Sequence, residues 1–188
     1  MIDIQSKKNA LRKLILNKRD TLTKSQILEA SKEIFTSLLS CEQYKNATNI
    51  CLYVPIRNEV DLFQYVHQMY LDQKRIWLPR IKNHEMEFYC YEYGVTKLID
   101  GAYHIPEPDS LCKLNPNQQD SCLIIMPGAV FSKSNDRIGY GGGYYDRYLE
   151  RYKNCMTVAV CYAFQIISDF PTEQTDVKPD MILSSNCI

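Results

Sequence analysis

A glycine-rich loop is the part of the sequence whose composition points most directly to chemistry. Four of the seven glycines fall within five residues, inside the segment from Arg137 to Asp146. Glycine permits positive φ angles and lets backbone N–H groups approach an anion without obstruction by a Cβ atom. A helical pattern begins at about Tyr144, so the loop would present its N–H groups at a helix N-terminus, which is a phosphate-binding geometry. A tight structural turn is the alternative interpretation.

Neither standard phosphate-binding fingerprint fits this loop. No Lys follows the glycines, as G-x-x-x-x-G-K-[ST] requires, and Tyr144 stands at the last glycine position of G-x-G-x-x-G. Asp146 could hold Mg²⁺, which takes one or two carboxylates together with phosphate oxygens and water. It could also stabilise the helix dipole as a first-turn aspartate. A second acidic cluster, Glu173, Asp176 and Asp180, lies in a proline-containing loop and by itself indicates a solvated surface.

Two cations near the start of the chain are spaced for a common task. Lys8 and Arg12 are four residues apart. Lys8 directly precedes a predicted helix over Asn9–Asn17, and Arg12 lies within it. Side chains at this spacing project from one helical face. Both could therefore contact the same anion.

The remaining sequence supplies the elements that must position these residues. The predicted strands cover residues 49–54, 75–78, 86–93, 122–126, 157–162 and 181–183, and further helices begin at a capping box over residues 23–26 and at Asp61. Strands that alternate with helices indicate a parallel or mostly parallel sheet, and continuous apolar runs are typical of strands covered on both faces. We predict an α/β fold, with a mostly parallel central sheet flanked by helices on both faces, as a single compact domain over residues 1–188.

Three predicted strands end in proline, at Pro55, Pro79 and Pro127. Because proline cannot continue a central strand, each marks a chain that leaves the sheet at a carboxyl end, where open α/β sheets bind ligands. Polar residues just beyond these points would then share one crevice. They are Arg57, Glu59, Arg80 and the loop over residues 132–143. The alternative is that they are solvated loop residues.

Composition narrows the class of protein. The 188 residues carry 22 Lys+Arg and 22 Asp+Glu, and this neutral balance argues against a general nucleic-acid binder. No apolar run is long enough to span a membrane, and the first residues lack the apolar core of a secretory signal. The eight Cys include no C-x-x-C pair, and Cys51, Cys122 and Cys161 lie in apolar strands, so we expect buried, reduced thiols in a cytoplasmic protein.

Several further motifs occur in a fixed order with the glycine-rich loop. They are Lys8-Asn9-Ala10-Leu11-Arg12, Tyr53-Val54-Pro55 with Glu59, Leu78-Pro79-Arg80, Ile105-Pro106-Glu107-Pro108, Met126-Pro127-Gly128, and Glu173, Asp176 and Asp180. Together they resemble the 5-formyltetrahydrofolate cyclo-ligase family, also called methenyltetrahydrofolate synthetase, over nearly the whole chain. The resemblance implies an ATP-dependent closure of 5-formyltetrahydrofolate to 5,10-methenyltetrahydrofolate with release of ADP and phosphate. The formyl oxygen would attack the γ-phosphate, and N10 would close the ring, so the protein would position the reactants and stabilise charge.

The resemblance also assigns roles to individual residues. Its ATP-binding positions match Lys8, Asn9, Ala10, Leu11, Arg12, Arg137, Ile138, Gly139, Tyr140, Gly141, Gly142, Gly143, Tyr144 and Tyr145. Its folate-binding positions match Val54, Glu59, Tyr140, Gly141, Gly142, Gly143 and Tyr144, with Glu59 accepting hydrogen bonds from pterin N–H groups. Its magnesium positions match Asp146 and Asp180, and Arg137 and Asp146 are the expected catalytic residues. Nucleic acid and membranes are not expected partners, and we expect a monomer.

One position departs from the family pattern. Some members place Lys where this chain has Gly142. The missing charge could come from Lys8, Arg12, Arg80, Arg137 or Arg147. Tyr103 lies just before the Ile-Pro segment, and we interpret it as a core contact, with stacking on adenine or pterin as the alternative.

Two other classes of function compete with this hypothesis. A sugar-phosphate isomerase or a CoA-transferase-like enzyme would have a similar α/β sheet, but would not require ATP and should show an acid–base pair near the loop. A non-catalytic protein that binds nucleotide or folate is the third possibility. The presence of Asp146 and Asp180 favours an active enzyme over that one.

Overall fold

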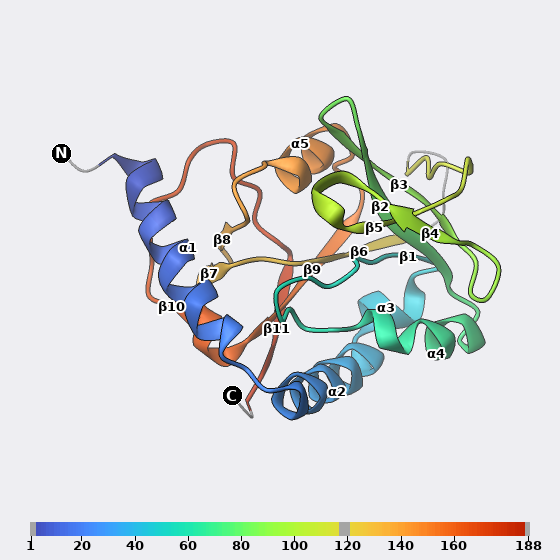
Figure 1. Cartoon of the computed structure of the whole chain (residues 1–188), viewed down its shortest axis with the longest axis horizontal. Helices are drawn as coiled ribbons and strands as arrows, with labels where there is room; N and C mark the ends of the chain where they lie inside the picture. The colour runs from blue at the N-terminus through green and yellow to red at the C-terminus, as the bar shows by residue number, and fades with distance from the viewer. Residues whose placement is uncertain (1–2, 117–120, 187–188) are drawn as a thin grey trace.

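The chain folds around a six-stranded sheet, shown in Figure 1 as a computed structural model that describes residues 3–116 and 121–186. The strand order is β11-β9-β6-β1-β2-β3, and all neighbours are parallel except β2 and β3. The strands are β1 (Asn49–Cys51), β2 (Arg75–Lys82), β3 (Glu85–Tyr91), β6 (Cys122–Met126), β9 (Met156–Tyr162) and β11 (Met181–Ser185). The predicted mostly parallel sheet is confirmed.

Helices cover both faces of this sheet, as predicted. Helices α2 (Lys24–Ser40), α3 (Glu42–Asn46) and α4 (Val66–Leu71) pack on one face, and α5 (Tyr144–Arg151) packs on the other (Figure 1). Alternate residues of β6 serve the two faces, because successive side chains of a strand point to opposite sides. Leu123 and Ile125 join the core beneath α2, whereas Ile124 and Met126 join the core beneath α5.

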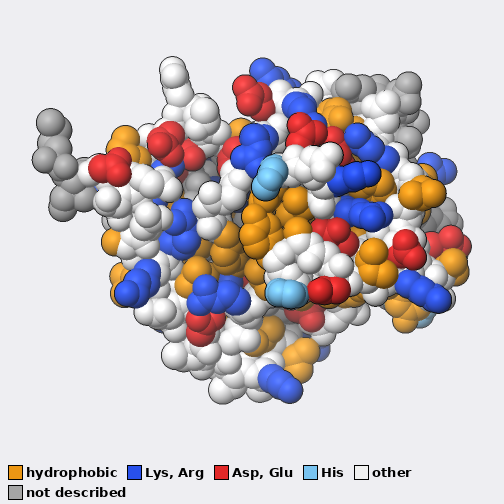
Figure 2. Space-filling model, turned by 45° about the horizontal axis from the view of Figure 1, so that its top comes forward, with side chains coloured by type: hydrophobic (Ala, Val, Ile, Leu, Met, Phe, Trp, Pro, Cys, Tyr) orange, Lys and Arg blue, Asp and Glu red, His pale blue; other side chains and the backbone are white. Residues whose placement is uncertain are grey.

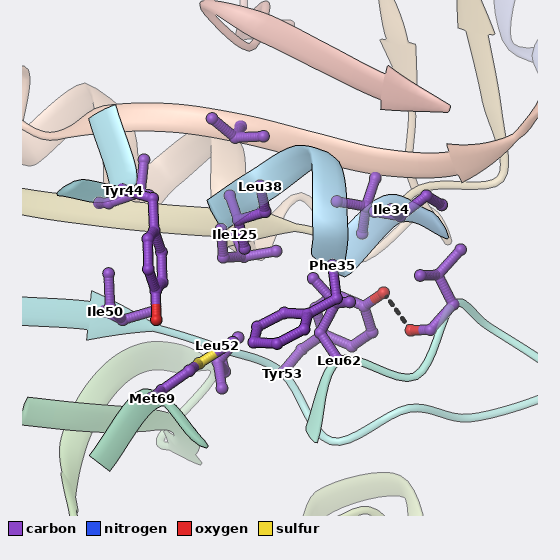
Figure 3. Packing of buried hydrophobic residues seen from close by; sticks show 14 of the residues in the cluster. Ile34, Phe35, Leu38, Tyr44, Ile50, Leu52, Tyr53, Leu62, Met69 and Ile125 are labelled. Carbon is purple, nitrogen blue, oxygen red and sulfur yellow. Dashed lines mark hydrogen bonds between the residues drawn. The ribbon is translucent and has the colours of Figure 1, made fainter. Parts of the chain in front are cut away.

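The core beneath α2 is drawn in Figure 3. Ile34 and Leu38 of α2 are completely buried, and they lie in one cluster with Ile50 and Leu52 from the β1 segment. Helix α2 begins with the predicted capping box, in which the Thr23 and Gln26 side chains each accept from the other residue's backbone N–H. Burial of this apolar face stabilises the helix more than its intrinsic propensity does.

Helix α1 (Ile4–Asp20) lies at one end of the sheet, against a small sheet of β7 (Val130–Ser132), β8 (Arg137–Ile138) and β10 (Ile166–Ile167). Ile15 and Leu16 of α1 form a third buried cluster with Val130 and Ile138. This packing fixes the cation-bearing helix beside the start of the glycine-rich loop. The remaining elements are short: β4 (Leu98–Asp100), β5 (Pro106–Pro108), and the 3₁₀ turns η1 (Phe63–Tyr65), η2 (Ala102–His104) and η3 (Ala163–Gln165).

The prediction that a strand ends at Pro79 is wrong, because β2 continues through it to Lys82. Strand β1 pairs with β2 only from Arg75 to Trp77, so beyond that point β2 has lost its parallel neighbour. The N–H of Ile81, two residues on, points away from β3 and donates to Glu107 Oε1 (3.0 Å). The Pro79 nitrogen faces the same open side, where no strand requires an N–H donor.

The predictions for cysteines and membrane segments can be compared with the described residues. Cys51, Cys122 and Cys161 are buried, as expected, and the cysteines of the described chain are free thiols. Cys187 lies outside the described residues. Among the helices of the described chain, none has the length and apolar character needed to cross a bilayer.

Candidate active site

One large cavity of about 810 Å³ lies where the carboxyl ends of β1 and β6 meet α1 and the glycine-rich loop. Most of its lining comes from one face of α1, the loop after β1, the turn before β5, the glycine-rich loop with the start of α5, and the loop around Glu173. Side chains from β2, β3, β5 and the residue after β6 complete it: Pro79, Ile81, Met86, Glu107 and Pro127. Figure 2 shows a face on which hydrophobic side chains gather in a hollow and charged side chains surround them. The predicted crevice therefore exists, although its walls differ in part from those expected.

The glycine-rich loop owes its course to two positive φ angles. Gly141 has φ +99°, and Gly143 has φ +63° at the N-cap of α5, conformations that residues with a Cβ atom rarely adopt. The left-handed Gly143 starts α5 at Tyr144, as the sequence predicted. All residues from Arg137 to Arg147 line the cavity, so both the loop and the first turn of α5 form part of its wall.

Arg137 is a buried cation at the start of the glycine-rich loop, where it lines the cavity. Strand β8 pairs with β7 and holds Arg137 at the start of the loop, where its Nη2 donates to Asp146 Oδ1 at 3.0 Å. Its Nε and the hydroxyl of Tyr145 are buried without a hydrogen-bond partner in the described structure. Native proteins satisfy nearly all buried polar groups, and because both residues line the cavity, a bound ligand is one source of acceptors for these two donors.

Only one of the two predicted magnesium ligands lines the cavity. Asp146 lines the cavity, and its two protein partners, Arg137 Nη2 and the Val177 N–H (3.1 Å), both contact Oδ1, so that Oδ2 is available. Asp180 Oδ2 instead accepts from the Thr157 N–H (2.8 Å) and hydroxyl (2.7 Å) at the start of β9, and Asp180 does not line the cavity. Within residues 3–116 and 121–186, no group of three or more His, Cys, Asp or Glu side chains could hold a metal ion. A single carboxylate such as Asp146 still fits Mg²⁺ that arrives with phosphate oxygens and water.

The acidic loop is not merely solvated. Lys8 is only 4% exposed, and its Nζ donates to Glu173 Oε2 (2.8 Å) and Asp176 Oδ2 (2.5 Å). Burial alone would lower the pKa of Lys8, but its hydrogen bonds to Asp176 and Glu173 and their negative charges outweigh this effect and raise it. Lys8 therefore remains a cation at the cavity wall.

Arg12 lies on the same face of α1 as Lys8, as predicted, and also lines the cavity. Its Nε donates to the carbonyl of Gly139 at 2.7 Å, and its Nη1 donates to Asn9 Oδ1. Burial lowers the pKa of Arg12, since no carboxylate among the described residues is paired with it. Asn9, Ala10 and Leu11 do not line the cavity, and Leu11 packs against the cluster beneath α1.

Glu59 forms the opposite wall, next to Val54, and both line the cavity as predicted. Glu59 is 4% exposed, with Oε1 accepting from the Tyr140 hydroxyl (2.5 Å) and Oε2 from the Ile56 N–H (2.9 Å). Burial raises the pKa of Glu59, although the nearby Arg19 charge and these two hydrogen bonds oppose the shift. Three groups of the protein therefore hold this carboxylate: the Tyr140 hydroxyl, the Ile56 N–H and the Arg19 guanidinium.

Arg57, Arg80 and the first part of the predicted loop, residues 132–136, lie outside the cavity wall. Arg57 pairs with Asp20, and Arg80 Nε lies 3.7 Å from Glu107 Oε2, and neither arginine lines the cavity. Each of these two arginines pairs with a carboxylate from a distant part of the sequence.

The interpretation of Tyr103 as a core contact is wrong. Tyr103 is 70% exposed, has φ +59°, and lines the cavity. Its hydroxyl lies 2.8 Å from the hydroxyl of Tyr144 across the cavity mouth, with the two rings edge to face. The position before an Ile-Pro segment was the only sequence signal of this role.

Arg19 is a site component that the sequence did not reveal. It is 1% exposed on α1, and it donates to the Tyr140 hydroxyl and to the Arg57 carbonyl (2.8 Å). Its spacing of seven residues from Arg12 places it on the same side of α1, and this spacing was the signal available.

Gly142 is packed against the ring of Tyr144. A Cβ atom at residue 142 would lie 2.6 Å from Tyr144 Cε2, so a longer side chain there requires this ring to move. The guanidinium of Arg147 lies over the same ring, 5.0 Å from its centroid, and donates to the Gly142 carbonyl at 2.9 Å. The positive charge of Arg147, from α5, therefore lies next to residue 142.

Comparisons with known proteins show which family the chain resembles. Residues 4–185 match the model of the 5-formyltetrahydrofolate cyclo-ligase family. The chain is 32% identical to the 5-formyltetrahydrofolate cyclo-ligase of Mycoplasma pneumoniae, covering 94% of this chain and 98% of that protein. It is 28% identical to the probable 5-formyltetrahydrofolate cyclo-ligase of Schizosaccharomyces pombe, covering 95% of each. The solved structure of Aquifex aeolicus 5,10-methenyltetrahydrofolate synthetase is similar, with a TM-score of 0.82, 31% identity, and coverage of 95% of this chain and 90% of that one.

Proposed function

Because the chain belongs to the 5-formyltetrahydrofolate cyclo-ligase family, we propose that its cavity uses Mg²⁺ and ATP to close 5-formyltetrahydrofolate to 5,10-methenyltetrahydrofolate. Family membership makes the protein a ligase of folate one-carbon metabolism, with folate and ATP as small-molecule partners. The observation that supports the proposal is that two groups of residues with different chemistry line the same cavity. One wall presents cations and unsatisfied donors, and the other presents a buried carboxylate.

The first wall suits the triphosphate of ATP. Lys8, Arg12, Arg137 and Arg147 line the cavity together with the backbone of the glycine-rich loop. Arg137 Nε and the Tyr145 hydroxyl are donors without a protein partner in the described structure, and both suit phosphate oxygens. Arg12 and Arg147 also supply the positive charge that a Lys at residue 142 gives some relatives, whereas Arg80 does not line the cavity.

The second wall suits the pterin end of the folate. Glu59 is a buried carboxylate whose oxygens have further lone pairs for pterin N–H donors. Val54 and Ile56 provide apolar surface beside it, and Tyr103 and Tyr144 provide aromatic surface at the mouth. In this arrangement the folate formyl group would lie toward the loop that we propose to hold the phosphates.

In the proposed reaction, both nucleophiles belong to the substrate. The formyl oxygen attacks the γ-phosphorus and ADP leaves; N10 then bonds the activated formyl carbon, loses its proton, and phosphate departs as the ring closes. Arg137 neutralises charge that develops on the transferred phosphoryl group, because its guanidinium is fixed by Asp146 at the cavity wall. The protein contributes by positioning the two substrates and excluding water, and needs no acid–base triad.

Mg²⁺ would be held by Asp146 Oδ2 and by oxygens of the nucleotide, and it would supply charge neutralisation at the phosphates. Asp180 as a second ligand stays a prediction, since its carboxylate would have to leave Thr157. The monomeric state and the extent of the domain over residues 1–188 also stay predictions, and size-exclusion chromatography with light scattering tests the first.

The direct test is the appearance of methenyl absorbance when the protein is mixed with 5-formyltetrahydrofolate, ATP and Mg²⁺. We expect product only when all three are present. Binding of both substrates without product would identify a non-catalytic relative. Failure of ATP to bind would refute the proposed reaction and favour another α/β enzyme class.

A further inference from the structure

The hydroxyl of Tyr140 joins the two walls of the cavity. Tyr140 lies within the glycine-rich loop, yet its hydroxyl donates to Glu59 Oε1 at 2.5 Å on the opposite wall. The same hydroxyl accepts a hydrogen bond from Arg19 Nη2 of α1. No other side chain among the described residues of the loop from 139 to 143 makes such a link, because the other four are glycines.

The backbone around Tyr140 is held by α1 as well. Arg12 donates to the carbonyl of Gly139, the residue before Tyr140, and its guanidinium also lies next to Gly141. Thus α1 contacts the loop at its backbone through Arg12 and at the tip of its tyrosine through Arg19. Movement of the loop backbone would displace the Tyr140 hydroxyl from Glu59.

The pKa of Tyr140 determines which group donates in the hydrogen bond between Tyr140 and Glu59. Burial and the Glu59 charge raise the pKa of Tyr140, so its hydroxyl keeps its proton and acts as a donor to the carboxylate. Donation from Arg19 to the phenol oxygen polarises the hydroxyl and strengthens its bond to Glu59. Glu59 also accepts the Ile56 N–H through its other oxygen, so Tyr140 is the partner that connects it to the loop.

We propose that Tyr140 is a positioning residue through which an anion in the glycine-rich loop and the folate at Glu59 strengthen each other's binding. The inference rests on the proposed function, which places ATP at the loop and the pterin at Glu59. Phosphate contacts order the loop backbone, the ordered loop fixes the Tyr140 hydroxyl, and the hydroxyl fixes the carboxylate that receives the pterin. Linkage requires the effect to be reciprocal, so bound folate must tighten nucleotide binding by the same factor.

The test measures that factor in the full-length protein. Calorimetry gives the Kd of 5-formyltetrahydrofolate with and without a saturating β,γ-imido ATP analogue and Mg²⁺, and the reverse titration gives the Kd of the analogue. Wild type should show the same tightening in both directions, within the roughly 5- to 150-fold range of such couplings. In Tyr140→Phe the factor should fall to about one, whatever change the variant makes to the Kd of either ligand alone.

Tyr162→Phe is the matched control. Like Tyr140, Tyr162 donates its hydroxyl to a residue in the loop after β1, here to the carbonyl of Asn58, but Tyr162 is fully buried and does not line the cavity. This variant should retain the wild-type factor. If Tyr140→Phe melts before measurement, Arg19→Lys offers a second route, because a lysine keeps the charge but lacks the guanidinium that reaches the hydroxyl; its factor should also fall.

The outcomes separate this inference from the proposed function. If both ligands bind wild type but the factor is one, or if Tyr140→Phe keeps the wild-type factor, the coupling role is refuted while the proposed function stands. If neither ligand binds wild type, the proposed function itself fails, and the inference fails with it. A factor lost in Tyr140→Phe and kept in Tyr162→Phe supports the proposal.

Discussion

Replacing Glu59 by Gln removes the negative charge of the carboxylate that we propose to bind the pterin, with little change in the shape of the side chain. Glu59 Oε1 accepts from Tyr140 and lies 3.9 Å from Arg19 Nη1, and Oε2 accepts from the Ile56 N–H. Every protein partner is a donor, so the new amide NH₂ must face a donor in either orientation. The substitution also leaves the buried Arg19 without its nearest negative charge.

The structure sets the size of the expected effect. The new amide leaves at least one buried donor without an acceptor, which costs about 1–3 kcal/mol, and Arg19 keeps carbonyl acceptors on Arg57 and Gly128. For a chain of this size, that loss lowers Tm by roughly 2–12 °C. Loss of charged hydrogen bonds to the pterin, about 1.5–3 kcal/mol, should raise the folate KM by roughly 10- to 150-fold.

The assay follows initial methenyl formation against folate concentration at saturating ATP, alongside a thermal melt. Glu87→Gln is the control, because Glu87 is buried on β3 with Lys113 (3.3 Å) and Arg151 (3.0 Å) but does not line the cavity. The control should lose less stability, since its partners are more exposed, and should keep the wild-type KM. A folded Glu59→Gln protein with an unchanged folate KM would show that this carboxylate does not bind the pterin.

Three further outcomes are expected. Asp146→Asn should lower kcat by at least about 100-fold with little change in folate Kd, because it loses the metal's carboxylate and the partner of Arg137; wild-type turnover in this variant would contradict the assignment. Gly142→Ala should displace the Tyr144 ring, which lies 2.6 Å from the new Cβ, and raise KM for both substrates; unchanged KM values would show that the ring does not shape the cavity. Since burial raises the pKa of Glu59, folate KM should increase as pH falls toward that pKa, at a higher pH than for an ordinary glutamate. Because the pKa of Glu59 is raised in the folded protein, ionisation of this carboxyl lowers the free energy of unfolding as the pH rises from the ordinary pKa of a glutamate through the raised one. Both pH effects should vanish in Glu59→Gln.

The fold and the glycine-rich loop could be predicted because their signals are local. Apolar runs mark doubly covered strands, and clustered glycines mark positive φ near a helix start, so the loop of residues 139–143 and its place at strand ends followed from adjacent residues. The strand through Pro79 could not be predicted in this way, because its tolerance depends on where β1 stops pairing with β2.

The partners of the site's charged residues could not be predicted, because they come from distant parts of the chain. Whether Asp180 faces a metal or the start of β9 depends on the pairing of β11 with β9. The exposure of Tyr103 depends on a left-handed turn in a non-glycine residue, for which composition gives no signal. Arg19 looked like any other cation of a basic helix until the fold buried it beside Tyr140.

The contact of Lys8 with Glu173 and Asp176 has a consequence for how the protein is made. These partners are separated by 165 and 168 residues in the sequence. During synthesis, α1 leaves the ribosome long before the carboxylates that fix its lysine. This wall of the cavity is therefore completed only after residue 176 has emerged, and a nascent chain interrupted before residue 173 carries a cationic helix without the acidic loop that holds it in place.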